Sequence, residues 1–244
     1  MIRAVTFDVT HTLIHCPRLG EIYAEVLGRH GVRVEPEEAG RLVRLVWQEL
    51  SCAADPGRDR FTSHPEGPAG WWKRFLERLC EHLEAPPPSR FAAAELFARF
   101  GRPASWDVYP DVPDTLEALH GRGLKLGVIS NWGWGGPELL HDIELAQHFE
   151  QIVISARVGY QKPDVNIFRH ALELMNVAPE RAIHVGDSYQ ADVAGAQEVA
   201  DGLRINAALR GVGGADDPDA VSLGERQVHE LVRDVIVAAG EDGV

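Results

Sequence analysis

The chain has 244 residues, 45% of them hydrophobic, and a formal net charge of −13 from 24 Lys and Arg against 37 Asp and Glu. This length and composition suit one large globular domain, or a core domain that carries a smaller insert. The acidic balance and the lack of a local basic stripe argue against nucleic acid or an anionic membrane surface as partners. An anionic substrate would therefore need local Lys, backbone N–H groups or a metal ion at its site.

The three cysteines, Cys16, Cys52 and Cys80, are an odd number and have no C-x-x-C spacing. They predict neither a disulfide framework nor a zinc site, and they suit a reducing compartment. The first predicted strand begins within a few residues of Met1, and no apolar run approaches the length of a membrane span. We therefore expect a cytoplasmic protein.

The first predicted strand, Ala4–Phe7, is apolar and ends at Asp8. From about residue 16 to residue 105 the pattern changes to helical periodicity, with no convincing strand. Helices are expected at 21–30 and 36–50, an apolar stripe follows at 71–83, and Ser89 is suited to cap the next helix. We predict an all-helical domain of residues 16–105, inserted where it would cover a site at the strand edge. The alternative is a helical subdomain that only completes a core.

Strands and helices alternate from residue 106 onward. Buried strands are predicted at 124–130, 152–155, 182–185 and 203–208, and helices at 111–120 and 164–175. This alternation is typical of a parallel sheet with right-handed crossovers. The predicted fold class is α/β: a Rossmann-like parallel-sheet core of residues 1–15 and 106–244, carrying the inserted all-helical domain.

Two carboxylates, Asp187 and Asp192, follow the predicted strand at 182–185, which ends in a glycine. Because parallel strands bring their carboxyl ends to the same edge of a sheet, we expect these carboxylates to lie close to Asp8. Carboxylates gathered without compensating bases are costly unless they share protons or a cation. A hard divalent metal ion is the first expectation. His184, inside the apolar strand, is expected to be a hydrogen-bonded core residue and not a ligand.

The strand ends, taken in chain order, resemble the sequence motifs of the haloacid dehalogenase (HAD) superfamily of hydrolases. The four motifs are Asp8-x-x-x-Thr12, Val128-Ile129-Ser130-Asn131, Lys162-Pro163 and Gly186-Asp187-Ser188-x-x-x-Asp192. Each is weak alone, but four in this order, each beside a predicted strand or helix start, form a specific pattern. The helical insert is similar to the C1 cap of the first subclass. Trp71-Trp72 and the opening of the 111–120 helix are most similar to the haloacid dehalogenase-like hydrolase domain-containing protein 3 group.

The resemblance implies a hydrolase in which Asp8 attacks phosphorus and forms an aspartyl-phosphate that water hydrolyses. Lys162 would hold Asp8 ionised and offset phosphoryl charge. The Ser130 hydroxyl and the turn that begins at Asn131 would donate hydrogen bonds to phosphoryl oxygens. The implied cofactor is Mg²⁺. Its ligands would be the carboxylates of Asp8 and Asp187 and the backbone carbonyl of Thr10, with Asp192 holding a metal-bound water or supporting the other ligands.

Thr10 departs from the phosphatase pattern, which has a second Asp two residues after the nucleophile as general acid and base. A threonine keeps the backbone carbonyl, but its hydroxyl does not exchange a proton near neutral pH. Since such assistance is worth about 10²–10⁴-fold, the expected enzyme is a slow phosphatase, or one restricted to good leaving groups. His11, which replaces the usual glycine, and His15 are alternative proton donors.

Two alternatives to a Mg²⁺-dependent phosphatase of a small phosphorylated metabolite stay open. One is a metal-independent, haloacid dehalogenase-like hydrolase that attacks carbon in another anionic small molecule. The other is a catalytically weakened protein that keeps the fold for binding or regulation. The pair Asp187 and Asp192 speaks against the first, and the retention of Asp8, Lys162 and Asp187 together speaks against the second. The pattern specifies no oligomeric state.

Overall fold

The computed structural model describes residues 2–52 and 57–199, so the strand predicted at 203–208 lies outside the described residues. The chain divides into two compact units. One contains the residues up to His15 and those from Val108 onward, and the other is Cys16–Asp107. We describe each unit by itself.

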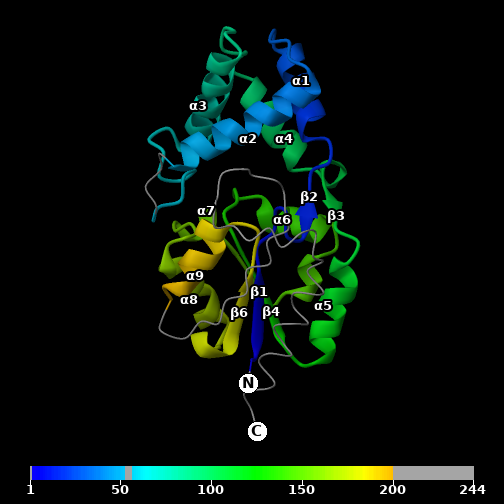
Figure 1. The fold of residues 1–244 in the computed structure, drawn as a ribbon, viewed down its shortest axis with the longest axis vertical. Coiled ribbons are helices and arrows are strands. Elements are labelled where there is room, and N and C mark those ends of the chain that lie inside the picture. Colours follow the sequence, from blue (N-terminus) through cyan, green and yellow to red (C-terminus); the bar gives the residue numbers. More distant parts are fainter. Residues whose placement is uncertain (1, 53–56, 200–244) are drawn as a thin grey trace. The chain divides into compact units, whose positions relative to one another are not determined.

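A parallel sheet forms the centre of the first unit (Figure 1). Its strands are β1 (Ala4–Phe7), β4 (Lys125–Ser130), β5 (Gln151–Ile154) and β6 (Ala182–Val185), in the order β5-β4-β1-β6. Each neighbouring pair is parallel, with Phe7 in register with Val128 on one side and Val185 on the other. Since β1 and β6 are buried along their whole length, both faces of the sheet are covered, as parallel sheets require. The predicted α/β fold class is confirmed.

Helices cover the two faces of this sheet. They are α5 (Val112–Gly121), α6 (Gly136–Asp142), α7 (Ser155–Val158), α8 (Val165–Met175) and α9 (Gly195–Gln197), the last preceded by a π-helical segment, Tyr189–Ala194. In Figure 1, α5 lies on one side of the sheet, and α8 and α9 lie on the other. The 3₁₀ turns Ala146–His148 and Pro179–Arg181 also belong to this unit, and a further 3₁₀ turn, Pro103–Ser105, belongs to the second unit.

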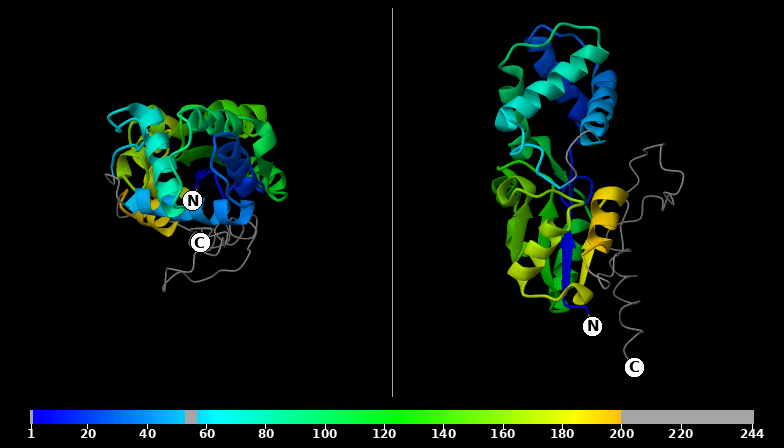
Figure 2. Two further views of the ribbon diagram at one scale, coloured as in Figure 1. Left: turned by 90° about the horizontal axis from the view of Figure 1, so that it is seen from above. Right: turned by 90° about the vertical axis from the view of Figure 1, so that its left-hand side faces the viewer.

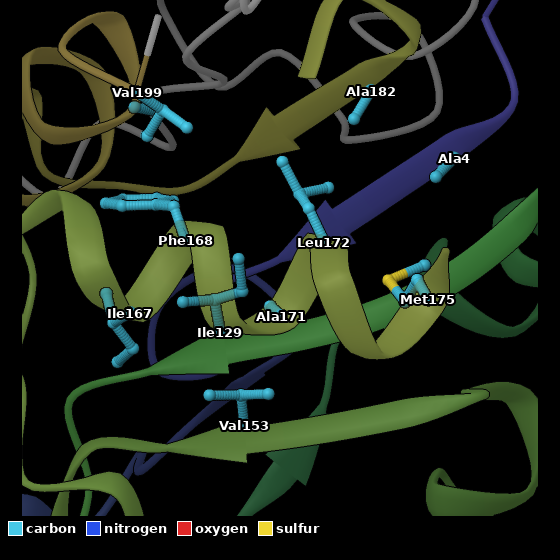
Figure 3. Close-up of a cluster of buried hydrophobic side chains, with 11 residues drawn as sticks. Ala4, Ile129, Val153, Ile167, Phe168, Ala171, Leu172, Met175, Ala182 and Val199 are labelled. Atoms are coloured by element: carbon cyan, nitrogen blue, oxygen red, sulfur yellow. The ribbon is translucent and has the colours of Figure 1, made fainter. Parts of the chain in front are cut away.

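The apolar face of α8 builds the core on its side of the sheet. The helix begins where the Asp164 carboxylate accepts a hydrogen bond of 2.7 Å from Asn166 N, and it ends at Asn176, whose φ of 51° is left-handed. Figure 3 shows its buried side chains facing the strands: Ile167, Phe168, Ala171, Leu172 and Met175. Burying one of the larger of these side chains stabilises the fold by roughly 1.5–3 kcal/mol. The helix is thereby held directly after Lys162-Pro163.

Two short strands were not predicted from the sequence. They are β2 (Ile14–His15) and β3 (Asp107–Val108), which pair with one another where the helical insert begins and ends. Strands of two residues are too short to show the period-two alternation that identifies a strand in a sequence.

The second unit is built from helices α1 (Leu19–Arg29), α2 (Pro36–Cys52), α3 (Gly67–His82) and α4 (Ala92–Phe100), seen from two further directions in Figure 2. Helices α1 and α2 approach closely at Gly20, where a Cβ would lie 2.0 Å from the Pro36 carbonyl oxygen. The prediction that Ser89 caps the fourth helix is wrong. Phe91 holds the N-cap position, and Ser89 Oγ accepts a hydrogen bond of 3.4 Å from Phe91 N.

An aromatic cluster fills part of the helical unit. Trp71 and Trp72 meet at right angles with their ring centroids 5.0 Å apart, and the neighbouring rings are Trp47, Phe61 and Phe75. Such edge-to-face pairs add about 0.5–1.5 kcal/mol each beyond their buried area. The Trp71-Trp72 pair thus belongs to the packing of this unit. No helix in the described ranges is both long and apolar enough to cross a membrane.

Candidate active site

Asp8 and Lys162 form a buried ion pair at the carboxyl edge of the sheet. Asp8 directly follows β1, and its backbone N–H donates to the Val185 carbonyl at 2.8 Å, so the residue continues the pairing with β6. Lys162 Nζ donates to Asp8 Oδ1 at 2.6 Å. The exposed fractions of Asp8 and Lys162 are 7% and 3%. The ammonium therefore acts on a carboxylate that water hardly screens.

Asp192 is the second partner of Lys162. Its Oδ1 lies 2.5 Å from Lys162 Nζ, and its Oδ2 accepts a hydrogen bond of 2.9 Å from Ser188 N. His184 Nε2 lies 3.0 Å from the same Oδ1. Asp192 stands in the π-helical segment after β6 and is 1% exposed. Both of its oxygens are thus committed to protein donors, which suits a supporting position and not a direct metal ligand.

The loop that carries Lys162 is held from two sides. The Asn131 side chain makes two hydrogen bonds to the Lys162 backbone. Its Oδ1 accepts from the Lys162 N–H at 2.7 Å, and its Nδ2 donates to the Lys162 carbonyl at 2.9 Å. On the other side, α9 packs so closely that a Cβ on Gly195 would lie 2.6 Å from Pro163 Cα. Asn131 therefore fixes Lys162, a role that its position in the sequence did not reveal. Ser130 ends β4 and is 2% exposed.

The charges in the site shift the pKa values of its members in opposite directions. Burial alone would lower the pKa of Lys162, but Asp192 and Asp8 more than offset it and raise that pKa. Burial would likewise raise the pKa of Asp192, yet Lys162 and His184 hold it below its usual range. Asp187 differs, because burial and the negative charges of Asp8 and Asp192 raise its pKa well above the usual value. Asp8 and Asp192 are thus ion-paired with the lysine, whereas Asp187 forms no ion pair among the described residues.

This excess negative charge fits a divalent cation. Three carboxylates and one ammonium leave two unbalanced negative charges when all are ionised, and Asp187 has no ion-pair partner among the described residues. No group of three or more His, Cys, Asp or Glu side chains in residues 2–52 and 57–199 encloses a metal site. Mg²⁺ does not need such a cage, since it commonly takes one or two carboxylates and keeps waters and phosphate oxygens as its other ligands. The donors present suit Mg²⁺.

The turn after Asp8 contains Thr10, which stands where the phosphatase pattern has a second Asp. The Val9 carbonyl accepts from Leu13 N at 2.8 Å, and His11 N donates to the Ile14 carbonyl at 2.7 Å, which closes a tight turn. This turn holds His11 at a φ of 63°, a left-handed conformation that favours glycine. His15 stacks on Tyr109 with ring centroids 4.5 Å apart. The left-handed backbone explains why glycine suits position 11, and His adopts it at a cost.

The structure brings together most of the side chains that the sequence singled out. Asp8, Lys162 and Asp192 are in direct contact, Asn131 contacts the Lys162 backbone, and Asp187 lies within the electrostatic reach of this group. Thr10 and Ser130 lie in the turn after β1 and at the end of β4. The expectation that His184 is a hydrogen-bonded core residue is confirmed, but its contact with Asp192 was not foreseen.

A family model of the haloacid dehalogenase-like hydrolases matches residues 2–199, which spans both the sheet and the helical insert. The chain belongs to the haloacid dehalogenase-like hydrolases. A relative within this family is haloacid dehalogenase-like hydrolase domain-containing protein 3 of Bos taurus, 32% identical over 81% of this chain and 79% of the relative. The predicted resemblance to that group is confirmed.

Two further proteins are similar to this chain. The glyceraldehyde 3-phosphate phosphatase of Methanopyrus kandleri is 32% identical over 80% of each chain. The magnesium-bound crystal structure of the HAD hydrolase YfnB from Bacillus subtilis superposes with a TM-score of 0.73, covering 96% of this chain and 99% of that one. At 16% identity the YfnB likeness shows the shared fold. The HAD hydrolase assignment therefore rests on the family model and the sequence relatives.

Proposed function

We propose that the chain is a Mg²⁺-dependent phosphatase of a small phosphorylated metabolite, which forms an aspartyl-phosphate on Asp8 and turns over slowly because residue 10 is Thr. The observation that carries the proposal is the buried contact of 2.6 Å between Lys162 Nζ and Asp8 Oδ1. An ammonium at this distance stabilises the negative charge of the carboxylate that would act as the nucleophile. The relative from Methanopyrus kandleri, a phosphatase named for a small phosphorylated substrate, supports the substrate class.

The two steps would use the same few residues. Asp8 attacks phosphorus, and the bond between phosphorus and the leaving oxygen breaks as the new O–P bond forms. Lys162 offsets negative charge on the phosphoryl group, and the Ser130 hydroxyl donates to one of its oxygens. Water then attacks phosphorus in the aspartyl-phosphate, which frees Asp8 and releases inorganic phosphate. Asn131 keeps Lys162 in place through both steps by its two hydrogen bonds to the Lys162 backbone.

The excess negative charge at Asp187 supports the proposed cofactor. Mg²⁺ would be held by the carboxylates of Asp8 and Asp187 and by the Thr10 backbone carbonyl, with Asp192 supporting through a water. When bound, it would polarise the phosphoryl oxygens and neutralise charge that develops on them. The magnesium in the YfnB crystal structure agrees with this expectation.

Thr10 sets the expected rate. A threonine hydroxyl neither protonates the leaving oxygen nor takes a proton from the attacking water, and such assistance is worth about 10²–10⁴-fold. The first step would therefore favour leaving groups that depart readily as anions. The second step would lack its base for every substrate and would limit turnover.

The helical unit Cys16–Asp107 is proposed as the cap that selects the substrate. In the chain order, this unit is inserted between β1, which Asp8 follows, and β4, which ends in Ser130. Side chains of such an insert are suited to contact the part of the substrate that does not react.

Hydrolysis of an aryl phosphate with and without Mg²⁺ tests this proposal. We expect Mg²⁺-dependent turnover in the wild type and none in Asp8→Asn. Asp142→Asn is the matched control, because this exposed carboxylate lies at the end of α6, outside the proposed site, and its loss should leave turnover unchanged. Turnover that persists in Asp8→Asn would overturn the proposal. Halide release without Mg²⁺ would instead assign the carbon-attacking hydrolase, and activity that appears only in Thr10→Asp would favour the binding protein.

A further inference from the structure

His184 is enclosed with a polar partner at each ring nitrogen. The residue lies in β6 and is 1% exposed, and its register partner in β1 is Thr6. Its Nδ1 lies 2.9 Å from Thr6 Oγ1, and its Nε2 lies 3.0 Å from Asp192 Oδ1. The Phe168 ring of α8 meets the imidazole edge to face, at 5.1 Å between centroids and 85° between planes. The imidazole therefore has little freedom to rotate or to meet water.

The partners of the imidazole define where its proton lies. An ionised Asp192 only accepts hydrogen bonds, so the ring nitrogen that faces it, Nε2, must carry hydrogen. With hydrogen on Nε2, a neutral ring leaves Nδ1 bare as an acceptor. The Thr6 hydroxyl then donates to Nδ1 at 2.9 Å, a shorter contact than its 3.3 Å distance from the Ile183 carbonyl. The Thr6 hydroxyl thus selects the tautomer that donates to Asp192.

These contacts connect a strand interior to the proposed nucleophile. Thr6 contacts His184, His184 contacts Asp192, Asp192 contacts Lys162 Nζ, and that ammonium donates to Asp8 Oδ1. Each side chain in this series contacts the next, so the orientation of one constrains the orientation of its neighbour.

We propose that His184, oriented by the Thr6 hydroxyl, is a positioning residue that keeps Asp192 turned toward Lys162 and thereby fixes the ammonium against Asp8. The effect on turnover rests on the phosphatase function proposed above. The orientation of the ring does not, because it follows from the contacts alone. Neither His184 nor Thr6 touches the reacting atoms in this account.

Paired substitutions separate positioning from packing. His184→Leu keeps a buried apolar side chain without a donor, whereas the amide of His184→Gln places an N–H near the site of Nε2. We expect kcat to fall about 10–100-fold in His184→Leu with little change in KM, and to recover most of its value in His184→Gln. Thr6→Val should lower kcat less, and Thr6→Ser should restore it. The matched control is Thr115→Val, which removes a buried hydroxyl that donates to the Asp111 carbonyl at 2.7 Å in α5 and should leave kcat unchanged.

The second readout needs no catalysis. In the full chain labelled with ¹⁵N-histidine, the ring signal that disappears in His184→Gln identifies His184 among the 11 histidines. We expect a neutral ring with hydrogen on Nε2 in the wild type and in Thr115→Val, and a changed Nδ1 signal in Thr6→Val. Hydrogen on Nδ1 alone, or equal kcat losses in His184→Gln and His184→Leu, would overturn the inference. A wild type without phosphatase activity but with hydrogen on Nε2 would contradict the proposed function and leave the positioning contact supported.

Discussion

The Asp192 carboxylate fills the space that a side chain at position 186 would occupy. A Cβ on Gly186 would lie 2.2 Å from Asp192 Cγ and 2.3 Å from Asp192 Oδ2. These distances are too short for any pair of non-bonded heavy atoms. Asp192 therefore reaches Lys162 only because residue 186 is a glycine, and the glycine at the end of β6 is part of the ion-pair geometry.

Gly186→Ala should displace Asp192 and separate it from Lys162. Overpacking of this kind costs about 1–3 kcal/mol of unfolding free energy, which urea denaturation would measure. Aryl phosphate turnover should fall as well. Gly28→Ala is the control, because the added Cβ in α1 has no atom within 4 Å, and alanine stabilises a helix by up to about 1 kcal/mol relative to glycine. A Gly186→Ala protein with wild-type stability and turnover would contradict the ion-pair account.

Much of the fold was predictable because its elements carry strong periodic signals. The strands Ala4–Phe7 and Ala182–Val185 are mostly apolar runs followed by Asp8 and Gly186, and α8 repeats its apolar residues at helical spacing. The two-residue strands β2 and β3 carry no such signal. Ser89 shows a different failure, since a residue suited to capping does not determine where a helix begins when the chain continues past it to Phe91.

The gathering of charged side chains at one edge of the sheet was predictable, and their contacts with one another were not. Carboxylates at strand ends identified Asp8, Asp187 and Asp192, because parallel strands end at a shared edge. The sequence does not specify which way a side chain turns once it is there. Two contacts depend on that orientation and appear only in the structure. They are the hydrogen bond from His184 to Asp192 and the hydrogen bond between the Asn131 side chain and the Lys162 backbone.

Lys162→Met should destabilise the fold strongly. The ammonium is ion-paired with two buried carboxylates, Asp8 and Asp192, and removing one partner of a buried pair costs about 3–5 kcal/mol. Lys125→Met is the matched control. Lys125 donates to the Met175 carbonyl at 2.8 Å and pairs with Glu150 at 3.3 Å, but it is partly exposed, so its loss should cost about 0–1 kcal/mol. Equal losses of unfolding free energy in the two variants would contradict the electrostatic role of Lys162.

The stabilisation of the fold by Mg²⁺ should increase with pH. Because the pKa of Asp187 is raised in the metal-free fold, ionising Asp187 destabilises that fold as pH rises through the raised pKa. Mg²⁺ binds the ionised carboxylate and offsets this cost. We therefore expect the Mg²⁺-induced rise in Tm to be larger at about pH 8 than at about pH 5. Asp187→Asn should abolish the rise at both values. An equal rise at both pH values in the wild type would contradict the role of Asp187.

His11→Gly tests whether the imidazole delivers a proton. The left-handed φ of 63° lowers the unfolding free energy by about 1–2 kcal/mol for a non-glycine residue. Glycine avoids this strain, but its greater flexibility in the unfolded chain costs about 0.5–1 kcal/mol. The variant should therefore be as stable as the wild type or slightly more stable by urea denaturation. Its turnover of an aryl phosphate should be unchanged, because the account assigns no proton transfer to His11. A loss of tenfold or more in kcat with an intact fold would identify His11 as the missing proton donor.

The burst of aryl alcohol on rapid mixing with an aryl phosphate and Mg²⁺ tests the central claim most directly. If Asp8 is the nucleophile and Thr10 leaves the second step without a base, the first turnover should release about one equivalent of aryl alcohol per site before a slow steady state. Thr10→Asp should raise the steady rate by about 10²–10⁴-fold and diminish the burst. Asp8→Asn should show neither phase. Mg²⁺-dependent turnover without a burst in the wild type, unchanged in Thr10→Asp, or a burst that persists in Asp8→Asn, would contradict the account.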